Sequence, residues 1–253
     1  MVFTLPVPTK PFALLASRSE DAAADGEYAS FLRLTGLRAD ELVRIRMESG
    51  RFTPLDLDRF AGTFLGGSPF TTSVPAEHKS DDQLRIEAEL DVVLSEIHER
   101  DLPFLGTCFG IGALGRVAGG VVDGTYAEST AAVEINLTDE GRDDPLLAGM
   151  PPTFAAYVGH KEACTVLPPG AVLLARSEAC PVQMYRLGRN QYVTQFHPET
   201  DRDAVITRMS VYRHAGYFPA EEFESVVVRV SGVDVTDSHE VVRAFVRRYA
   251  RPA

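Results

Sequence analysis

The sequence predicts an α/β protein whose central sheet is mostly parallel and is flanked by helices. Two observations carry this prediction. In the first half of the 253-residue chain, short apolar runs typical of strands alternate with longer runs that repeat at helical spacing. In the second half, five strand-like runs follow one another through short links, and helical patterns then fill the C-terminal region.

The first half contains four strand-like runs and three helical ones. Residues 11–17, PFALLAS, are a continuous apolar run typical of a buried strand. In residues 41–48 polar and apolar side chains alternate, which is typical of a strand with one solvent-exposed face. The other expected elements are strands over 61–70 and 102–107, helices over 22–35 and 80–99, and a helix after the last strand to about Val117. Parallel sheets carry their sites at the carboxyl ends of strands, so the turns after these strands are the places to seek chemistry.

The second half predicts more strands and then helices. The expected strands cover 131–137, 153–159, 171–177, 181–188 and 191–197, with a hairpin turn at 188–190. The expected helices cover 203–216, 220–230 and 238–249, with Asp237 or Ser238 as the N-cap of the last. We expect one domain over 1–253, with a core over about 11–216 and a C-terminal helical extension over about 217–253.

Composition excludes several classes of function. The net charge of −11 argues against nucleic acid or an anionic membrane as a partner. Three widely spaced cysteines without a CxxC pair argue against a disulfide framework and a cysteine-based zinc site, so we expect a cytoplasmic protein without a metal. Prolines interrupt the apolar N-terminus and no apolar run reaches about 18 residues, so we expect neither a signal peptide nor a membrane span.

Residues 102–120, LPFLGTCFGIGALGRVAGG, allow two incompatible interpretations. Gly110, Gly112 and Gly115 spell G-x-G-x-x-G, the dinucleotide-binding pattern, but its glycines belong in the turn directly after a strand. Here the strand ends near Leu105, and the chain is expected to be helical by Gly110. The alternative is a nucleophile elbow centred on Cys108.

The elbow interpretation needs small residues on both sides of the nucleophile, and Gly106 and Gly110 meet this need. The helix that follows would favour a thiolate at Cys108 and offer the Phe109 N–H to a developing oxyanion. An inert buried cysteine is the alternative, because most free cysteines are of that kind. The G-x-C-x-G pattern alone does not decide between the two.

A cysteine nucleophile needs a base, and His197 is the best placed of the six histidines. It ends an apolar strand, and Glu199 lies two residues further along an extended segment, where it would face the same way. An incidental histidine at a strand end is the alternative. His98, His214 and His239 lie in charged helical stretches and are expected to be solvated. Gly67, in a glycine turn after the strand at 61–70, could present a second oxyanion N–H.

The LGGSP turn (65–69), the GTCFG elbow (106–110) and VTQFHPE (193–199) occur in this order. Together they resemble the class I glutamine amidotransferase family, of the type found with GMP synthase and anthranilate synthase. The resemblance runs from about Pro11 to His214 and includes residues 156–199, which are similar to the family's block from a Ser-His-x-Asp segment to the terminal His-Pro-Glu.

The resemblance implies a flavodoxin-like α/β fold and a Cys108–His197–Glu199 triad. It implies oxyanion or substrate contacts, which would come from Gly66, Gly67, Phe109, Gly110 and His160. The implied reaction is attack on a γ-carboxamide, formation of a γ-glutamyl thioester, release of ammonia and hydrolysis, with no cofactor. Ammonia released into water would be wasted, so the resemblance also implies a separate synthase subunit or hydrolysis without transfer.

Two departures from the family pattern affect the substrate. Gly112 stands where the family has a substrate-holding glutamine, and GHKE (159–162) replaces Ser-His-Gly-Asp. Glutamine is therefore the default substrate, and a γ-glutamyl conjugate or another small amide is an alternative. A non-catalytic binding protein that kept the fold is a further alternative, favoured by Gly112 and opposed by the intact Cys108, His197 and Glu199.

Overall fold

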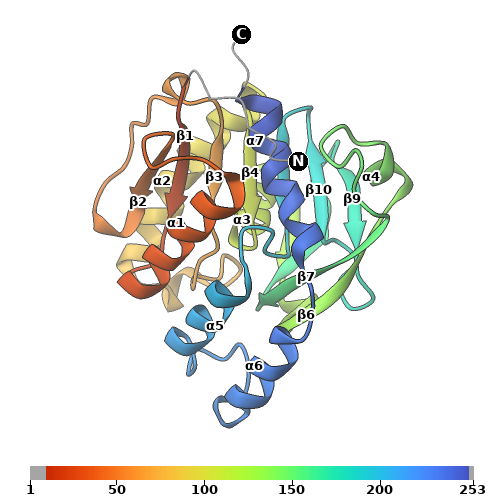
Figure 1. The fold of residues 1–253 in the computed structure, drawn as a ribbon. Coiled ribbons are helices and arrows are strands. Elements are labelled where there is room, and N and C mark those ends of the chain that lie inside the picture. Colours follow the sequence, from red (N-terminus) through yellow and green to blue (C-terminus); the bar gives the residue numbers. More distant parts are fainter. Residues whose placement is uncertain (1–9, 251–253) are drawn as a thin grey trace.

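Nine strands form a central sheet with helices on both sides (Figure 1). The computed structural model describes residues 10–250. The strands run in the order β2-β1-β3-β4-β11-β10-β9-β6-β7. Their bounds are β1 (Phe12–Ala16), β2 (Leu42–Arg46), β3 (Thr63–Leu65), β4 (Phe104–Thr107), β6 (Glu128–Leu137), β7 (Thr153–His160), β9 (Val172–Arg176), β10 (Met184–Leu187) and β11 (Gln191–Thr194).

The sheet is mixed, with a parallel half and an antiparallel half. Pairing is parallel from β2 through β1, β3 and β4 to β11, and antiparallel from β11 through β10, β9 and β6 to β7. The sequence predicted a mostly parallel central sheet, and the pairings from β2 to β11 are parallel. The hairpin at 188–190 joins β10 and β11 as expected, with Gly188 in the left-handed conformation.

Helices cover both faces of the sheet, as predicted for an α/β fold. Their bounds are α1 (Asp21–Thr35), α2 (Asp81–Glu99), α3 (Phe109–Val117), α5 (Arg202–Val211), α6 (Phe223–Ser231) and α7 (Glu240–Tyr249). Neighbouring residues of a strand enter opposite layers: Phe64 packs with α1 and α7, whereas Leu65 packs with α2 and α3. This alternation follows from the period of two along a strand.

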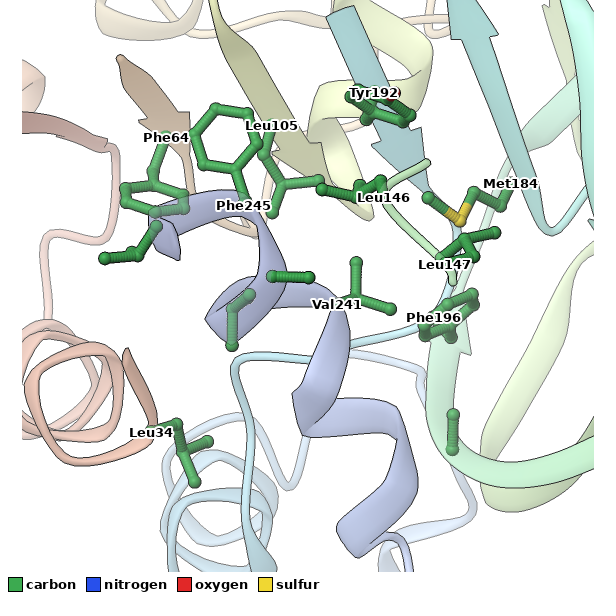
Figure 2. Close-up of a cluster of buried hydrophobic side chains, with 14 of the residues drawn as sticks. Leu34, Phe64, Leu105, Leu146, Leu147, Met184, Tyr192, Phe196, Val241 and Phe245 are labelled. Atoms are coloured by element: carbon green, nitrogen blue, oxygen red, sulfur yellow. The ribbon is translucent and has the colours of Figure 1, made fainter. Parts of the chain in front are cut away.

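The last helix is part of the main core. Val241, Val242, Phe245 and Val246 on α7 are buried in the cluster that contains Phe64, and Figure 2 shows Phe245 beside Phe64 and Leu105. The Phe245 ring lies 5.1 Å from the ring of Phe64, centroid to centroid. The helical extension predicted at the C-terminus therefore covers the middle of the parallel half of the sheet.

Three short elements were absent from the sequence prediction. They are β5 (Val121–Asp123) and β8 (Ala163–Val166), which pair with each other, and α4 (Asp139–Asp143). The helix predicted over 203–216 ends at Val211, because the chain then turns and the Tyr217 carbonyl accepts a hydrogen bond from Thr130 N on β6. Neither Asp237 nor Ser238 caps α7: both lie in a 3₁₀ turn, and the Ser238 hydroxyl donates to the Val235 carbonyl.

Within residues 10–250, no helix is long and apolar enough to cross a membrane. The first nine residues of the N-terminal stretch in which we expect no signal peptide lie outside the described part of the chain, as do residues 251–253 of the predicted extension.

The packing of α7 predicts that Phe245→Ala destabilises the whole fold. The loss of a fully buried aromatic ring should lower the free energy of unfolding by about 3–5 kcal/mol, because a cavity remains between α7 and the sheet. Urea denaturation followed by circular dichroism measures the change. Val228→Ala on the exposed face of α6 is the control, with an expected effect within about 0.5 kcal/mol. A small effect of Phe245→Ala would show that α7 is dispensable to the core.

Candidate active site

The parallel strands bring the predicted residues Gly67, Cys108 and His197, together with Arg18, to one edge of the sheet. The chain reaches Arg18 after β1, Gly67 after β3, Cys108 after β4 and His197 after β11. Because these strands are parallel neighbours, their carboxyl ends meet at the same edge. Residues that are far apart in the sequence thus come to line one pocket.

Cys108 occupies a strained turn between β4 and α3. Its φ of 51° lies in the left-handed region that non-glycine residues rarely adopt, and its N–H donates to the Thr194 carbonyl at 2.7 Å. A Cβ on Gly106 would lie 2.9 Å from the Gly110 Cα, so the turn closes because both residues lack side chains. This geometry is that of a nucleophile elbow.

The dinucleotide interpretation of the same stretch is wrong. Gly110, Gly112 and Gly115 lie inside α3, not in the turn that precedes it. Gly110 is in the first turn of α3, but Gly112 and Gly115 lie further along it, so the three amides are not gathered in a turn around a pyrophosphate.

His197 and Glu199 form a buried pair beside Cys108. His197 Nδ1 and Glu199 Oε1 are 2.8 Å apart, and the Glu199 side chain is completely buried. Thr200 donates its hydroxyl to the same carboxylate oxygen, and Ser30 donates to the Glu199 carbonyl. The carboxylate thus holds one ring nitrogen of His197, and Cys108 and His197 both line the pocket at this edge.

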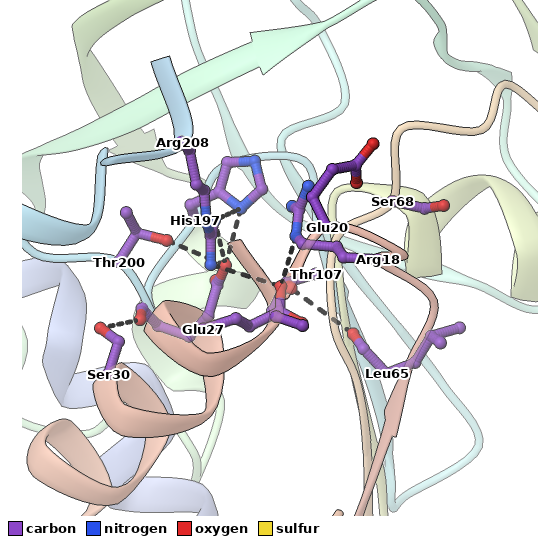
Figure 3. A network of polar contacts seen from close by, with 12 residues as sticks. Arg18, Glu20, Glu27, Ser30, Leu65, Ser68, Thr107, His197, Thr200 and Arg208 are labelled. Atoms are coloured by element: carbon purple, nitrogen blue, oxygen red, sulfur yellow. Dashed lines mark hydrogen bonds and ion pairs between the residues drawn. The ribbon is translucent and has the colours of Figure 1, made fainter. Parts of the chain in front are cut away.

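A second layer of buried charge surrounds the pair (Figure 3). Arg208 Nη1 donates to Glu199 Oε1 at 3.0 Å, and Arg208 Nη2 lies 3.3 Å from Glu27 Oε1. Arg18 Nε donates to the same Glu27 oxygen at 3.1 Å. We call Arg18, Glu27, His197, Glu199 and Arg208 the charge network. It is buried, so its charges attract one another with little screening by water.

The sequence analysis missed Glu27, Arg18 and Arg208. One signal could have revealed Glu27: it lies four residues before Phe31 and seven before Leu34, which places a carboxylate on the buried face of α1. A buried acid requires a cationic partner. The identity of those partners, Arg18 and Arg208, depends on the tertiary fold.

The pair perturbs the pKa values of both its members. Burial by itself lowers the pKa of His197, but the charges of Glu199 and Cys108 outweigh it and raise that pKa to about 9. Burial by itself raises the pKa of Glu199, but His197 and Arg208 hold it well below its usual range. At neutral pH the site therefore holds an imidazolium next to a carboxylate.

The glycine turn after β3 packs tightly against the charge network. A Cβ on Gly66 would lie 2.6 Å from Glu27 Oε2, and one on Gly67 would lie 2.9 Å from His197 Cε1. The Gly66 N–H donates to the Leu15 carbonyl, so it is not free for a substrate. The N–H groups of Gly67 and Phe109 have no backbone partner within residues 10–250.

His160 does not face the pocket. Its Nδ1 lies 3.0 Å from the Glu162 carbonyl oxygen and its Nε2 lies 2.9 Å from Glu128 Oε2. Both ring nitrogens are therefore engaged with protein groups, whereas the family resemblance implied that His160 contacts a substrate.

His98, His214 and His239 were expected to be solvated, and of these only His214 is exposed. His98 is half-buried beside Gln191, and His239 is buried. His239 Nδ1 donates to the carbonyl of Pro198, between the two residues of the His197–Glu199 pair. The 3₁₀ turn before α7, residues Thr236–His239, thus supports the backbone of the site.

The pocket next to Cys108 has a polar end and an apolar wall. Arg18, Ser68, Thr130 and His197 supply polar groups. The apolar wall comes from α5 and the turn that follows it, with side chains of Val205, Met209, Tyr212, Tyr217 and Phe218. This wall accepts an apolar or aromatic portion of a ligand.

The two departures from the family pattern, Gly112 and the GHKE segment (159–162), lie next to each other in the structure. The Glu162 carboxylate approaches α3 so closely that a Cβ on Gly112 would lie 3.1 Å from Glu162 Oε1 and from Thr72 Oγ1. Glu162 accepts hydrogen bonds from the N–H groups of Thr72 and Ser73. A longer side chain at position 112 would displace this arrangement.

Comparison with known sequences gives the family. The model of the glutamine amidotransferase class-I family matches residues 63–208. A subunit of the glutamine-hydrolyzing GMP synthase of Methanothrix thermoacetophila is 30% identical over 68% of this chain and 84% of its own. The corresponding subunit from Methanobrevibacter smithii is also 30% identical, over 54% of this chain and 63% of its own. The match to the longer GMP synthase of Porphyromonas gingivalis, 33% identical, spans 26% of that protein.

Solved structures share the fold. A glutamine amidotransferase from Thermotoga maritima superposes with a TM-score of 0.74 at 17% identity, covering 95% of this chain and 99% of that one. A glutamine amidotransferase from Methylobacillus flagellatus gives 0.71 at 19% identity over 96% of this chain and 97% of that one. With the sequence match across β3, the Cys108 elbow and the His197–Glu199 segment, these findings show that the chain belongs to the class I glutamine amidotransferase family.

Proposed function

We propose that this chain hydrolyses the γ-carboxamide of glutamine or of a γ-glutamyl amide through a thioester on Cys108. The observation that carries the proposal is the strained Cys108 elbow in one pocket with the buried His197–Glu199 pair. No cofactor is needed, because the thiol supplies the nucleophile and His197 carries the protons.

In the first step the Cys108 sulfur attacks the γ-carbonyl carbon of the amide. The imidazolium of His197 favours the ionised, nucleophilic thiol and then donates its proton to the departing nitrogen, which leaves as ammonia. The Gly67 and Phe109 N–H groups are available to stabilise the oxyanion of the tetrahedral intermediate. A γ-glutamyl thioester on Cys108 remains.

In the second step water attacks the thioester carbon. The neutral His197 accepts a proton from that water, and the sulfur of Cys108 leaves as a thiolate next to the re-formed imidazolium. Glu199 keeps the proton-carrying Nδ1 of His197 fixed and stabilises the positive charge that His197 gains. The products are ammonia and the γ-carboxylic acid.

The ammonia suggests a partner. The relatives are named as subunits of GMP synthase, so we propose that the ammonia is consumed by a separate synthase subunit, with hydrolysis without transfer as the alternative. A γ-glutamyl amide with an apolar amine is a second candidate substrate. The wall of Tyr212, Tyr217 and Phe218 and the closed space at Gly112 favour it.

The mechanism predicts that Cys108→Ala abolishes amide hydrolysis. Loss of the nucleophile should lower kcat for ammonia release by about 10⁴-fold or more, measured with L-glutamine and with γ-glutamyl amides of increasing apolar size. Cys164→Ala, at a buried cysteine outside the pocket, should keep wild-type activity. If no amide is hydrolysed and Cys108 also fails to react with a glutamine-like chloroketone, the binding-protein alternative replaces this proposal.

The raised pKa of His197 predicts an alkaline limit to activity. The ring must be protonated in the free enzyme to protonate the leaving nitrogen, so kcat/KM should fall as pH rises through about 9. Glu199→Gln removes the negative charge that raises this pKa, and the fall should then occur at lower pH. The measurement is a pH–rate profile of kcat/KM for the wild type and the variant. If the alkaline limb does not move in the variant, His197 is not the group that sets it.

Glu27 is predicted to be a positioning residue that acts through Arg208. Glu27→Gln leaves Arg208 with Glu199 as its main carboxylate partner, so Glu199 stabilises the His197 charge less. The alkaline limb of kcat/KM should move to lower pH, by less than in Glu199→Gln. Glu41→Gln is the matched control, since Glu41 is a buried carboxylate paired with Arg38 away from the pocket. A lower kcat with an unchanged pH profile would mean a purely structural role for Glu27.

A further inference from the structure

Three potential metal ligands gather outside the active-site pocket. Glu128 begins β6, His160 ends β7, and Cys180 lies in the loop between β9 and β10. Each offers one ligating atom, and these atoms all lie within 4.8 Å of one another. His160 and Cys180 are buried, and 9% of the Glu128 side chain is exposed. The proposed hydrolysis uses none of the three.

The hydrogen bonds of His160 prepare its Nε2 to act as a ligand. The Glu162 carbonyl oxygen can only accept, so the Nδ1 that lies 3.0 Å away carries a proton. In the neutral ring Nε2 then has a lone pair, and it points at a carboxylate oxygen of Glu128 only 2.9 Å away. At this distance a proton lies between the two atoms, and a metal ion could replace it only if the atoms moved apart to ligand spacing. Metal-binding histidines commonly donate their other nitrogen to a carbonyl in this way.

The surroundings of Glu128 add an independent observation. Gln183 is completely buried and donates Nε2 to Glu128 Oε2 at 2.9 Å and to the Ser177 hydroxyl at 3.1 Å. Its carbonyl oxygen has no hydrogen-bond partner within the described residues. Such an unpaired buried oxygen is unfavourable unless a further donor or cation reaches it.

A cleft open to solvent reaches the Glu128 side of this cluster, and neither His160 nor Cys180 lines it. Glu128 lines it together with Ser177 and with two exposed carboxylates, those of Glu134 and Glu178. The negative charge at its mouth would attract a cation. The cleft could also admit the water molecule that a three-ligand metal site commonly keeps.

We propose that Glu128, His160 and Cys180 bind a divalent zinc ion. A thiolate, an imidazole and a carboxylate are ligands that zinc accepts, and this mixed set disfavours magnesium and calcium, which prefer oxygen. Tetrahedral bonds of about 2.0–2.3 Å put ligand atoms roughly 3.5 Å apart, so side-chain shifts of about 1 Å complete the site. The ion would tie β6, β7 and the 177–183 loop together and leave the Glu162 carbonyl as the partner of His160 Nδ1.

Cobalt(II) substitution tests this proposal without an activity assay. The full chain with Cys108→Ala, which removes the reactive thiol from competition, is stripped with a chelator and titrated with Co²⁺. One equivalent should produce the near-ultraviolet thiolate-to-cobalt charge-transfer band and the visible bands of a tetrahedral ion. Zn²⁺ should abolish these bands by displacement and raise the melting temperature. X-ray absorption of the zinc form should show one sulfur at about 2.3 Å.

Matched variants locate the site. In the same background, Cys180→Ser should eliminate the charge-transfer band, and His160→Gln should weaken Zn²⁺ binding by about tenfold or more. Cys164→Ser, at the other buried cysteine, should change neither. The absence of a charge-transfer band in the parent protein would overturn the proposal and leave His160 and Glu128 as a hydrogen-bonded pair. A band that survives Cys180→Ser would overturn it equally. Because the parent spectrum decides, a variant that fails to fold does not obscure the result.

Discussion

The attraction between buried opposite charges is the interaction on which the site depends. Glu27 on α1 and Glu199 after β11 both hold Arg208 of α5, and Arg18 after β1 closes the network. Removal of one member of such a group leaves a buried charge without its partner, which commonly costs about 3–5 kcal/mol. The network therefore ties two helices and two strand ends together and keeps His197 in one orientation beside Cys108.

The same network explains why the turn after β3 contains two glycines. The sequence analysis assigned Gly67 to the oxyanion hole because glycine can present its N–H in unusual conformations, and the family resemblance added Gly66. The structure adds a steric reason: a side chain at Gly66 would collide with Glu27, and one at Gly67 would collide with Arg18 and His197. The small size of both residues thus lets the turn lie against the charge network.

Much of the fold and the centre of the site could be predicted from local pattern. Strand and helix periodicity predicted the α/β fold, and the spacing of Gly106, Cys108 and Gly110 allowed an elbow that the family resemblance then favoured, because both patterns depend on neighbours in the sequence. His239 was misjudged as solvated, since charged neighbours in its helix say nothing of the Pro198 carbonyl that it contacts. Arg208 and β8 were missed for the same reason: their partners, Glu27 and β5, are distant in the sequence.

The Gly112–Glu162 contact shows how two departures from the family pattern can be a single change. The glutamine of the family pattern needs space above α3, and Glu162 fills that space while it holds the N–H groups of Thr72 and Ser73. A large side chain at position 112 would collide with the Glu162 carboxylate and displace it. Without Glu162, the N–H groups of Thr72 and Ser73 would lose their hydrogen-bond acceptor. The ligand space that remains beside Cys108 extends toward Tyr212 and Tyr217. Under the proposed mechanism the γ-carbonyl stays at the thiol, so an apolar group on the amide nitrogen is the part of a γ-glutamyl amide proposed to reach this aromatic wall.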